Sequence, residues 1–371
     1  MSEYQCYEFL ALDRPLTVKQ MAELRAISTR AEISPTRFWN EYQWGDLKAD
    51  PAKLMERFFD AHVYFANWGT HRLMLRMPKA RVELKALKPF FVGGHAARLT
   101  SVGEYVLLDL GSDTEEPEDD EQSHGSLAAL SPLRAELMRG DLRPAYLAWL
   151  LAVGAGDVDD EAVEPPVPSG LAELTAAQEA LVAYLRIDVD LVAAAASGSS
   201  AVTEDNAPFR RWLKALSGRE KDAWLTRAAD EPDLGLGGEL LRAFQATTKG
   251  ESSGVRRTVG ELRTLAETQR AEREKAEAVR AKKTRAAADA VHQRHLTTLA
   301  DDLAGAWAKL EKFVETSSYD EAVKLARDLR DLATRDGTAA GFAQHFEALR
   351  KRQIRRRGFF DRWKHADVDP R

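Results

Sequence analysis

Residues 63–77 read VYFANWGTHRLMLRM, and this stretch decides the fold class of the first part of the chain. Two apolar runs, Val63–Trp68 and Leu73–Met77, lie on either side of Gly69-Thr70. Two such runs joined by a short turn are typical of paired β-strands, so the spacing predicts a β-hairpin. A sheet is therefore the expected framework of this region.

Strand signals also occur on both sides of the hairpin. Residues 4–12 are rich in aromatic side chains and predict a first strand, and Phe38–Trp44 alternates apolar and polar residues as a half-buried strand does. Further strands are predicted at Val82–Leu87 and Tyr105–Leu110.

Two helix signals separate these strands. Thr17-Val-Lys-Gln20 has the form of a capping box, and Asp50-Pro51 combines an N-cap with a proline at the first helical position. The resulting order β-α-β-α-β-β predicts a small α+β sandwich over residues 1–112, with a ferredoxin-like arrangement as one option.

The rest of the chain is expected to be mainly α-helical, so the predicted fold class is α+β. A long charged helical arm and a C-terminal helical hairpin or bundle complete this prediction. The expected organisation is an α+β domain at 1–112, an acidic loop at 113–125, a helical domain at 126–246, a linker at 247–254, and a long charged helix with a C-terminal bundle and basic tail at 255–371.

The long helix is the most unusual of these elements. Thr258-Val-Gly-Glu261 forms another capping box, and almost every residue between Gln269 and Ala290 is charged or Ala. A helix that is polar on all sides bridges solvent or lies against a partner. An apolar seam close to a heptad follows, which predicts a coiled-coil-like protein interface. The seam consists of Leu296, Leu299, Leu303, Trp307, Leu310 and Val314, and the first five are the predicted interface.

Composition excludes several classes of protein. Among the 371 residues Cys6 is the only cysteine, which excludes an intrachain disulfide framework, a cysteine-based zinc finger and a CxxC redox site. No apolar run approaches the roughly 20 residues of a membrane span, and the N-terminus lacks the pattern of a secretory signal. A cytoplasmic protein without a membrane span is therefore expected.

Charge is unevenly divided along the chain. Residues 255–371 carry 26 Lys/Arg and 19 Asp/Glu, a net charge of +7, so residues 1–254 carry −13 of the total of −6. The eight basic residues between Arg350 and Lys364, here called the basic patch, are candidates for binding nucleic acid or an acidic partner. They are Arg350, Lys351, Arg352, Arg355, Arg356, Arg357, Arg362 and Lys364.

Four interpretations of this stretch stay open at the level of sequence. Phe359, Phe360 and Trp363 can fold back on the terminal bundle, with the arginines left in solvent or facing acidic residues of their own chain. The patch can instead bind nucleic acid, a protein, or an anionic membrane surface into which the aromatic residues dip.

The other candidate residues are better explained by structural roles than as metal, anion or catalytic sites. His292 and His295 lie three apart on the long helix, with Asp289 nearby, but zinc needs more ligands, so solvated positions are expected. Gly93-Gly94-His95 is interpreted as a turn rather than an anion nest, and the acidic segment 157–164 as a solvated loop. Cys6 has no neighbouring base in the sequence. No catalytic residue, cofactor or metal ion is predicted.

Two segments carry a family resemblance. Phe209–Asp222, followed by Arg256–Leu262, and Tyr319–Ala333 resemble the C-terminal helical region of bacterial SWIM zinc-finger proteins, over about 207–360. The finger itself needs several cysteines, so zinc binding does not carry over. Asp13–Thr17 and Asn67–Gly69 resemble an uncharacterised bacterial family. The resemblance implies a bacterial source and a helical accessory module, and no activity.

These observations predict a non-enzymatic bacterial interaction or adaptor protein. Its helical arm is expected to bind a protein partner or a second copy, with membership of a larger complex as one option. The alternative is a nucleic-acid-associated protein that binds phosphates through its basic C-terminal third. An enzyme of unknown class is the third hypothesis.

Overall fold

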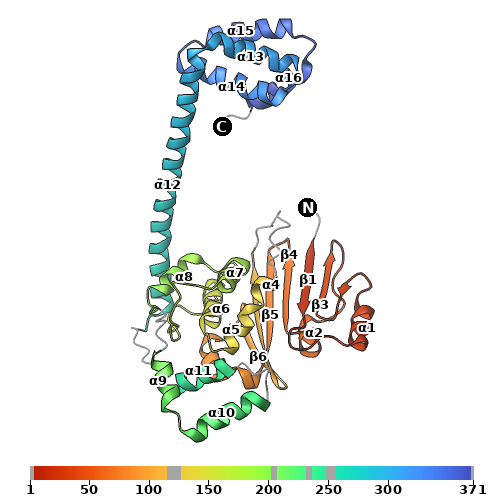
Figure 1. Ribbon diagram of the computed structural model, residues 1–371, viewed down its shortest axis with the longest axis vertical. Coiled ribbons are helices and arrows are strands. Elements are labelled where there is room, and N and C mark those ends of the chain that lie inside the picture. The colour runs from red at the N-terminus through yellow and green to blue at the C-terminus, as the bar shows by residue number, and fades with distance from the viewer. Residues whose placement is uncertain (1–3, 115–126, 202–206, 231–235, 248–255, 369–371) are drawn as a thin grey trace. The chain divides into compact units, whose positions relative to one another are not determined.

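The computed structural model describes residues 4–114, 127–201, 207–230, 236–247 and 256–368 (Figure 1). It divides into two compact units, Met1–Glu272 and Arg273–Arg371, here called unit 1 and unit 2. Most of the predicted acidic loop at 113–125 and of the linker at 247–254 lies outside the described residues.

Unit 1 is built on one antiparallel sheet whose described residues form seven strands. The strands are β1 (Gln5–Leu10), β2 (Glu32–Ile33), β3 (Arg37–Tyr42), β4 (Ala61–Ala66), β5 (Thr70–Pro78), β6 (Ala97–Val102) and β7 (Tyr105–Asp113), in the order β2-β3-β1-β4-β5-β7-β6. The predicted hairpin is confirmed as β4 and β5, in which Ala66 pairs with Thr70 and Gly69 takes φ +102°.

Two helices cover one face of this sheet near β1 and β3. Both predicted N-caps are present: Thr17 and Gln20 form the capping box of α1 (Val18–Ile27), and Asp50 caps α2 (Pro51–Arg57). β3 and β4 both pair antiparallel with β1 between them, so β3, α2 and β4 form one split β-α-β unit. The α+β class is confirmed, and the ferredoxin-like option stays a prediction.

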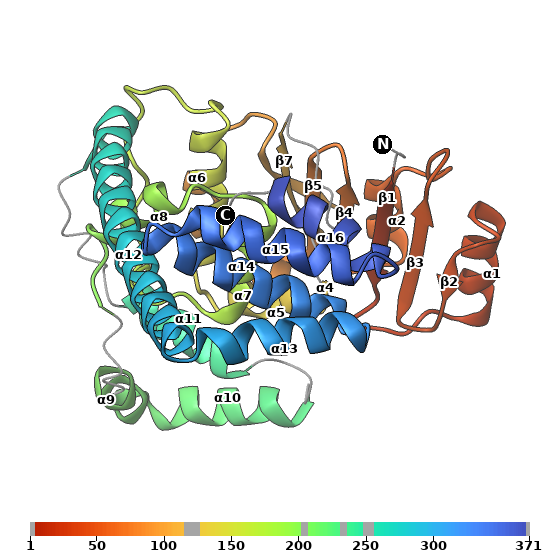
Figure 2. The same cartoon turned by 90° about the horizontal axis from the view of Figure 1, so that it is seen from above.

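A group of helices covers the opposite face (Figure 1, Figure 2). They are α4 (Leu127–Leu130), α5 (Pro132–Met138), α6 (Arg143–Gly154), α7 (Ala176–Tyr184) and α8 (Val189–Ala196). Leu73, Leu75 and Met77 alternate along β5 toward these helices, and α6 is buried from Pro144 to Val153. The sheet and these helices share one hydrophobic core. The predicted domain boundary after residue 112 therefore does not separate two domains with cores of their own.

The predicted strand at Val82–Leu87 is wrong. The chain instead forms two 3-10 turns, η1 (Lys79–Arg81) and η2 (Lys88–Phe90), on either side of α3 (Leu84–Leu87). The Glu83 carboxylate accepts a hydrogen bond from the Lys85 backbone N–H at 3.3 Å, which favours a helical start over a strand. One edge of the sheet is formed by β6, a strand that the pattern did not predict.

Three helices of unit 1 follow α8 in the chain: α9 (Ala207–Ala215), α10 (Gly218–Asp230) and α11 (Leu236–Thr247). α9 and α11 pack through Phe209, Trp212 and Phe244, whose ring centroids lie 5.5–5.9 Å apart. Ser217 and Glu220 complete the hydrogen bonds of a capping box at the start of α10.

Helix α12 (Val259–Asp301) has 43 residues, and the division between the two units falls within it. Its first turns are buried in unit 1 through Val259, Leu262 and Ala266, and Arg257 pairs with Glu164 at 2.8 Å just before it. Every residue from Ala271 to Ala290 is exposed.

Unit 2 is a helical bundle formed by the end of α12 with α13 (Leu303–Glu315), α14 (Tyr319–Arg335), α15 (Ala339–Arg352) and α16 (Arg357–Val368). Asp302 interrupts the predicted seam because its side chain accepts from the Gly305 N–H and starts α13 as a new helix. Leu310, Val314, Ala326 and Phe359 are buried in the core. Within the described ranges, no helix has the length and apolar character that crossing a bilayer requires.

Candidate protein-binding surface

The aromatic residues of the C-terminal stretch belong to the core of unit 2. Phe359 is fully buried, Trp363 is 9% exposed, and Phe360 packs partly buried beside them. Phe346 contacts both Phe359 and Trp363, with ring centroids 6.0 and 5.0 Å away. Side chains held in this way cannot enter a membrane surface, which removes the observation that favoured membrane binding.

Folding pairs half of the basic patch with its own chain. Arg352 pairs with Glu311 at 3.2 Å and Arg350 with Glu347 at 3.9 Å. Arg362 pairs with Asp320, and Arg356 donates to the Ser317 hydroxyl at 3.1 Å. The remaining four, Lys351, Arg355, Arg357 and Lys364, are exposed and have no hydrogen-bond or ion-pair partner among the described residues.

These contacts reduce the positive charge of the surface. Residues 350–364 carry a net +7 in the sequence, but in the folded unit three of their basic side chains pair with the carboxylates of Glu311, Asp320 and Glu347. The patch is therefore a weaker phosphate-binding surface than the sequence predicts.

The predicted seam divides into buried and open positions. Leu296 is 1% exposed and Leu310 is fully buried, so both stabilise unit 2 and neither can contact a partner. Leu299 and Trp307 are partly buried, and Leu303 is 46% exposed. Leu303 and Trp307 are thus the members of the predicted interface that a partner can reach most readily.

These two side chains line an apolar groove of about 500 Å³ in unit 2, here called the unit 2 groove. α14 and α15 supply the other wall, through residues that include Leu329, Leu332 and Phe342. The Trp307 ring lies 5.5 Å from that of Phe342 and 5.3 Å from that of His345. The heptad spacing does not predict the groove, because the spacing covers only α12 and α13 and the other wall comes from α14 and α15.

The α12 segment that leads to this groove is exposed and basic. Residues 273–295 carry seven Lys/Arg and three Asp/Glu. Arg273 pairs with Glu277 at 3.1 Å one turn away. An exposed cationic helix thus runs into an apolar groove within unit 2.

His292 and His295 lie on the same helix, and both side chains bind carboxylates of α14. His292 pairs with Asp331 at 3.3 Å and His295 with Asp328 at 3.0 Å, which fastens the end of α12 to α14. The described part of the chain contains no group of three or more His, Cys, Asp or Glu residues placed to hold a metal ion.

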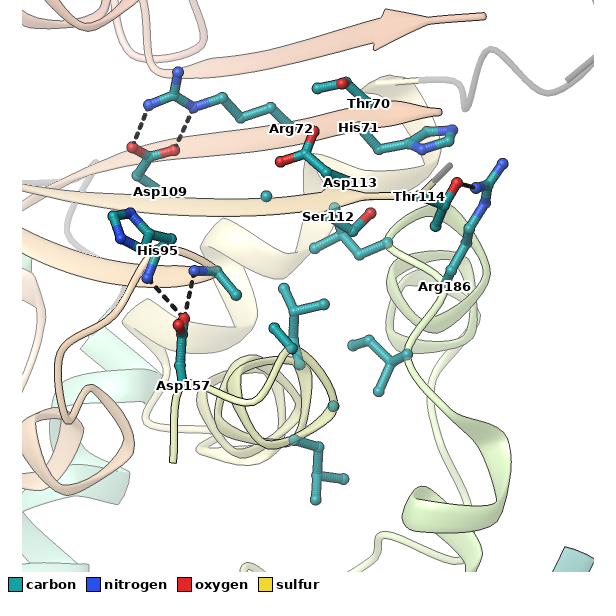
Figure 3. A pocket seen from close by; sticks show the side chains of 18 of the residues that line it. Thr70, His71, Arg72, His95, Asp109, Ser112, Asp113, Thr114, Asp157 and Arg186 are labelled. Carbon is teal, nitrogen blue, oxygen red and sulfur yellow. Dashed lines mark hydrogen bonds and ion pairs between the residues drawn. The ribbon is translucent and has the colours of Figure 1, made fainter. Parts of the chain in front are cut away.

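Unit 1 contains a polar cavity of about 670 Å³ (Figure 3). On one side of it the backbone N–H groups of His95 and Ala96 donate to the Asp157 carboxylate at 2.7 and 2.8 Å. The turn at Gly93-Gly94-His95 does bind an anion, and this anion is a carboxylate of the chain itself.

The acidic segment 157–164 is only partly solvated, which corrects its interpretation as a loop in solvent. Glu164 is 5% exposed, accepts a hydrogen bond from the Tyr146 hydroxyl and pairs with Arg257. Burial and the Glu164 charge raise the pKa of Tyr146. This pairing fixes the start of α12 in unit 1.

Cys6 is not an activated thiol. It is 9% exposed, and burial together with the Glu8 charge raises its pKa to about 12. The thiol is therefore protonated at neutral pH, whereas a nucleophilic cysteine needs a lowered pKa.

The comparisons with known proteins add no family. Protein families, curated proteins and solved structures gave no significant match to this chain. The likeness of residues 207–360 to the helical region of SWIM zinc-finger proteins therefore stays a prediction. Function is inferred from the residues described above.

Proposed function

We propose that this chain is a non-enzymatic interaction protein whose unit 2 binds an amphipathic helix of a protein partner. The observation that carries the proposal is the unit 2 groove, in which Leu303 is 46% exposed beside Trp307 and Phe342. Apolar side chains open to solvent in a groove between helices are typical of helix-in-groove recognition.

The positive charge of α12 determines which kind of partner helix is favoured. The α12 residues 273–295 that lead to the groove carry an excess of four positive charges. A partner helix with an acidic polar face is therefore favoured over a basic one. Its apolar residues, spaced i, i+3, i+4 and i+7, would lie against Leu303, Trp307 and Phe342.

A synthetic probe tests this proposal directly. The probe is a fluorescent 21-residue peptide with Leu at the i, i+3, i+4 and i+7 positions and Glu on the other face. We expect fluorescence anisotropy to show saturable binding to the full chain, and Leu303→Asp to weaken it at least tenfold. The matched control is Ile354→Asp, because Ile354 is 72% exposed in unit 2 outside the groove.

Two further peptides separate shape from charge. A scrambled peptide of the same composition keeps the charge and loses the apolar face, and a Lys-for-Glu peptide keeps the face and reverses the charge. If the scrambled and ordered peptides bound equally, the proposal that the groove recognises an apolar helix face would be rejected. A second copy of the chain is a different occupant, and sedimentation equilibrium would show it as a dimer that Leu303→Asp dissociates.

Nucleic-acid binding is a second candidate function because four cations of the basic patch have no partner in the part of the chain that the structure describes. If Arg355, Arg357 and Lys364 contact phosphates, anisotropy of labelled DNA and RNA will show affinity that falls steeply with salt. Replacing the three by Ala should then reduce the salt slope by about three. Arg352→Ala with Arg362→Ala is the control pair, since both residues are held by carboxylates. Unchanged affinity in the triple variant would reject this function.

A further inference from the structure

The cavity of unit 1 has the make-up of a small-molecule site and lies outside the surface proposed above (Figure 3). Its volume of about 670 Å³ falls within the range of ligand pockets, roughly 300–1,000 Å³. Strands β5 and β7 supply its polar wall, and helices supply the other.

The helical wall is apolar. Leu150 and Leu151 come from α6, and Leu185 and Ile187 come from the turn between α7 and α8. Leu185 is fully buried and Ile187 is 3% exposed, so the fold holds both side chains in place. This wall suits the hydrocarbon part of a ligand.

The opposite wall offers hydroxyl groups. The Ser112 hydroxyl on β7 is buried and has no hydrogen-bond partner among the described residues. Buried hydroxyls in native proteins are almost always paired, so this one is available to a bound group. Thr70 and Thr114 add two more hydroxyls to the same cavity.

Arg186 brings a positive charge to this wall by an unusual backbone conformation. Its φ is +53°, at the position after α7 where the Ile187 N–H bonds to the Val182 carbonyl at 2.9 Å. Glycine normally occupies this position in a Schellman motif, because other residues are strained there. The Arg186 guanidinium lines the cavity and donates to the Thr114 hydroxyl. This backbone conformation places the Arg186 side chain at the cavity.

The aspartates of the cavity are mostly engaged elsewhere. Asp109 accepts two hydrogen bonds from Arg72, Asp157 is held by two backbone N–H groups, and Asp188 pairs with Arg270 at 2.6 Å. Asp113 is exposed, and no partner for it is found among the described residues.

At His71 the charge of Arg186 has a larger effect than the charge of Asp113. Burial lowers the pKa of His71 to about 4, and the Arg186 charge lowers this pKa more than Asp113 raises it. His71 is therefore neutral at pH 7 and adds no charge of its own.

We infer that this cavity binds a small organic anion with an apolar body. The anionic group would pair with Arg186 and the Ser112 hydroxyl, and the apolar body would lie against Leu150, Leu185 and Ile187. The chemical class covers carboxylates, sulfonates and phosphate monoesters, since each presents acceptor oxygens to a guanidinium.

The test uses 8-anilinonaphthalene-1-sulfonate with the full chain, in a Leu303→Asp background that weakens probe binding to the unit 2 groove. We expect a saturable fluorescence signal of one probe per chain. Arg186→Gly should weaken it at least tenfold. Glycine relieves the strain at φ +53°, so this variant should fold at least as well as the parent, and circular dichroism and thermal unfolding check that it does.

A neutral probe of the same shape, N-phenyl-1-naphthylamine, separates charge from apolar contact. Its affinity should change less than twofold in Arg186→Gly, whereas Ile187→Trp should reduce binding of both probes by filling the cavity. The inference is overturned if the parent gives no saturable signal, if Arg186→Gly leaves sulfonate affinity within twofold, or if both probes weaken equally in that variant.

Discussion

At the scale of single residues, Gly94 shows how a close approach constrains one position of a turn. Gly93 and Gly94 take φ of +98° and +112°, so alanine is strained at either site. A Cβ at Gly94 would also lie 2.4 Å from the Asp157 carboxylate, whereas a Cβ at Gly93 meets nothing within 4 Å. Comparing alanine variants at the two glycines therefore distinguishes the cost of backbone strain from the cost of losing the Asp157 contact.

We expect Gly94→Ala to destabilise the protein more than Gly93→Ala does. Displacing Asp157 breaks two charge-assisted hydrogen bonds, which adds about 2–3 kcal/mol to the shared cost of strain. Urea unfolding of both variants measures the difference. Equal losses would show that the Asp157 contact contributes nothing to stability.

His62 makes stability depend on pH. Its ring is fully buried, stacked 3.8 Å from Phe9, and its Nδ1–H donates to the Glu8 carbonyl at 2.9 Å. Nε2 has no partner among the described residues, so no acceptor stabilises a second proton. Burial lowers the pKa of His62 from 6.5 to about 3. The folded state therefore keeps His62 neutral where the unfolded chain takes up a proton.

The sign of the effect follows from this difference. Between about pH 6.5 and pH 3 the unfolded chain binds more protons, so the stability due to neutral His62 is complete above that window and is lost as the pH falls through it. We expect about 2 kcal/mol less stability at pH 5 than at pH 7 from this residue. His62→Gln should remove that part of the pH dependence in urea unfolding, and an unchanged dependence would assign it to other groups.

Single residues also show where sequence analysis stops. Leu296, Leu303 and Leu310 share the same seven-residue spacing, yet Leu303 is 46% exposed and the other two are buried. Spacing places side chains on one face only within a single helix, and the new helix that starts after Asp302 separates Leu303 from Leu296. Between Leu303 and Leu310, on the same helix, spacing does not show which side chain other helices cover. Glu164 poses the same difficulty, because its partner Arg257 lies 93 residues away.

At the scale of elements, local signals were the reliable ones. The capping boxes at Thr17 and Thr258 form as their spacing predicts, because the partners are three residues apart. The strand predicted at Val82–Leu87 failed because a short alternating run also fits a helical turn, and β6 was missed because its pattern is largely polar.

Helix α12 is expected to be least stable in its middle. Residues 271–290 are all exposed, whereas Leu262 and Leu296 are buried near its two ends. Without tertiary contacts, an Ala-rich helix is only marginally stable in water. Hydrogen exchange of the full chain should therefore be at least about tenfold faster at 273–290 than at 259–266, with buried α6 as the slow reference. Uniform protection along α12 would mean that something covers its middle.

At the scale of the whole molecule, charge and core divide the chain in the same place. Unit 1 carries a net −12 and unit 2 a net +6. Among the described residues, unit 1 has two hydrophobic clusters and unit 2 has one of its own. The split at residue 254 that shows the uneven charge lies before the observed division at 272, because the first turns of α12 pack into unit 1 through Val259, Leu262 and Ala266. The sequence alone could not show that the sheet and α4–α8 share one core, since that depends on contacts distant in sequence.

Separate cores predict that the two units unfold separately. Phe359 is fully buried in unit 2 and Phe59 is fully buried in unit 1, which gives a matched pair of large-to-small substitutions. Each Phe→Ala change should cost its own unit about 3–5 kcal/mol through lost contacts and the cavity left behind.

Native-state hydrogen exchange measures the stability of the two units from separate peptides of one sample. In Phe359→Ala, amides of α13–α16 should lose protection while those of β1, β4 and α6 keep theirs, and Phe59→Ala should give the reverse. Loss of protection in both units from either substitution would mean that the chain unfolds as one cooperative body, with α12 coupling the two cores.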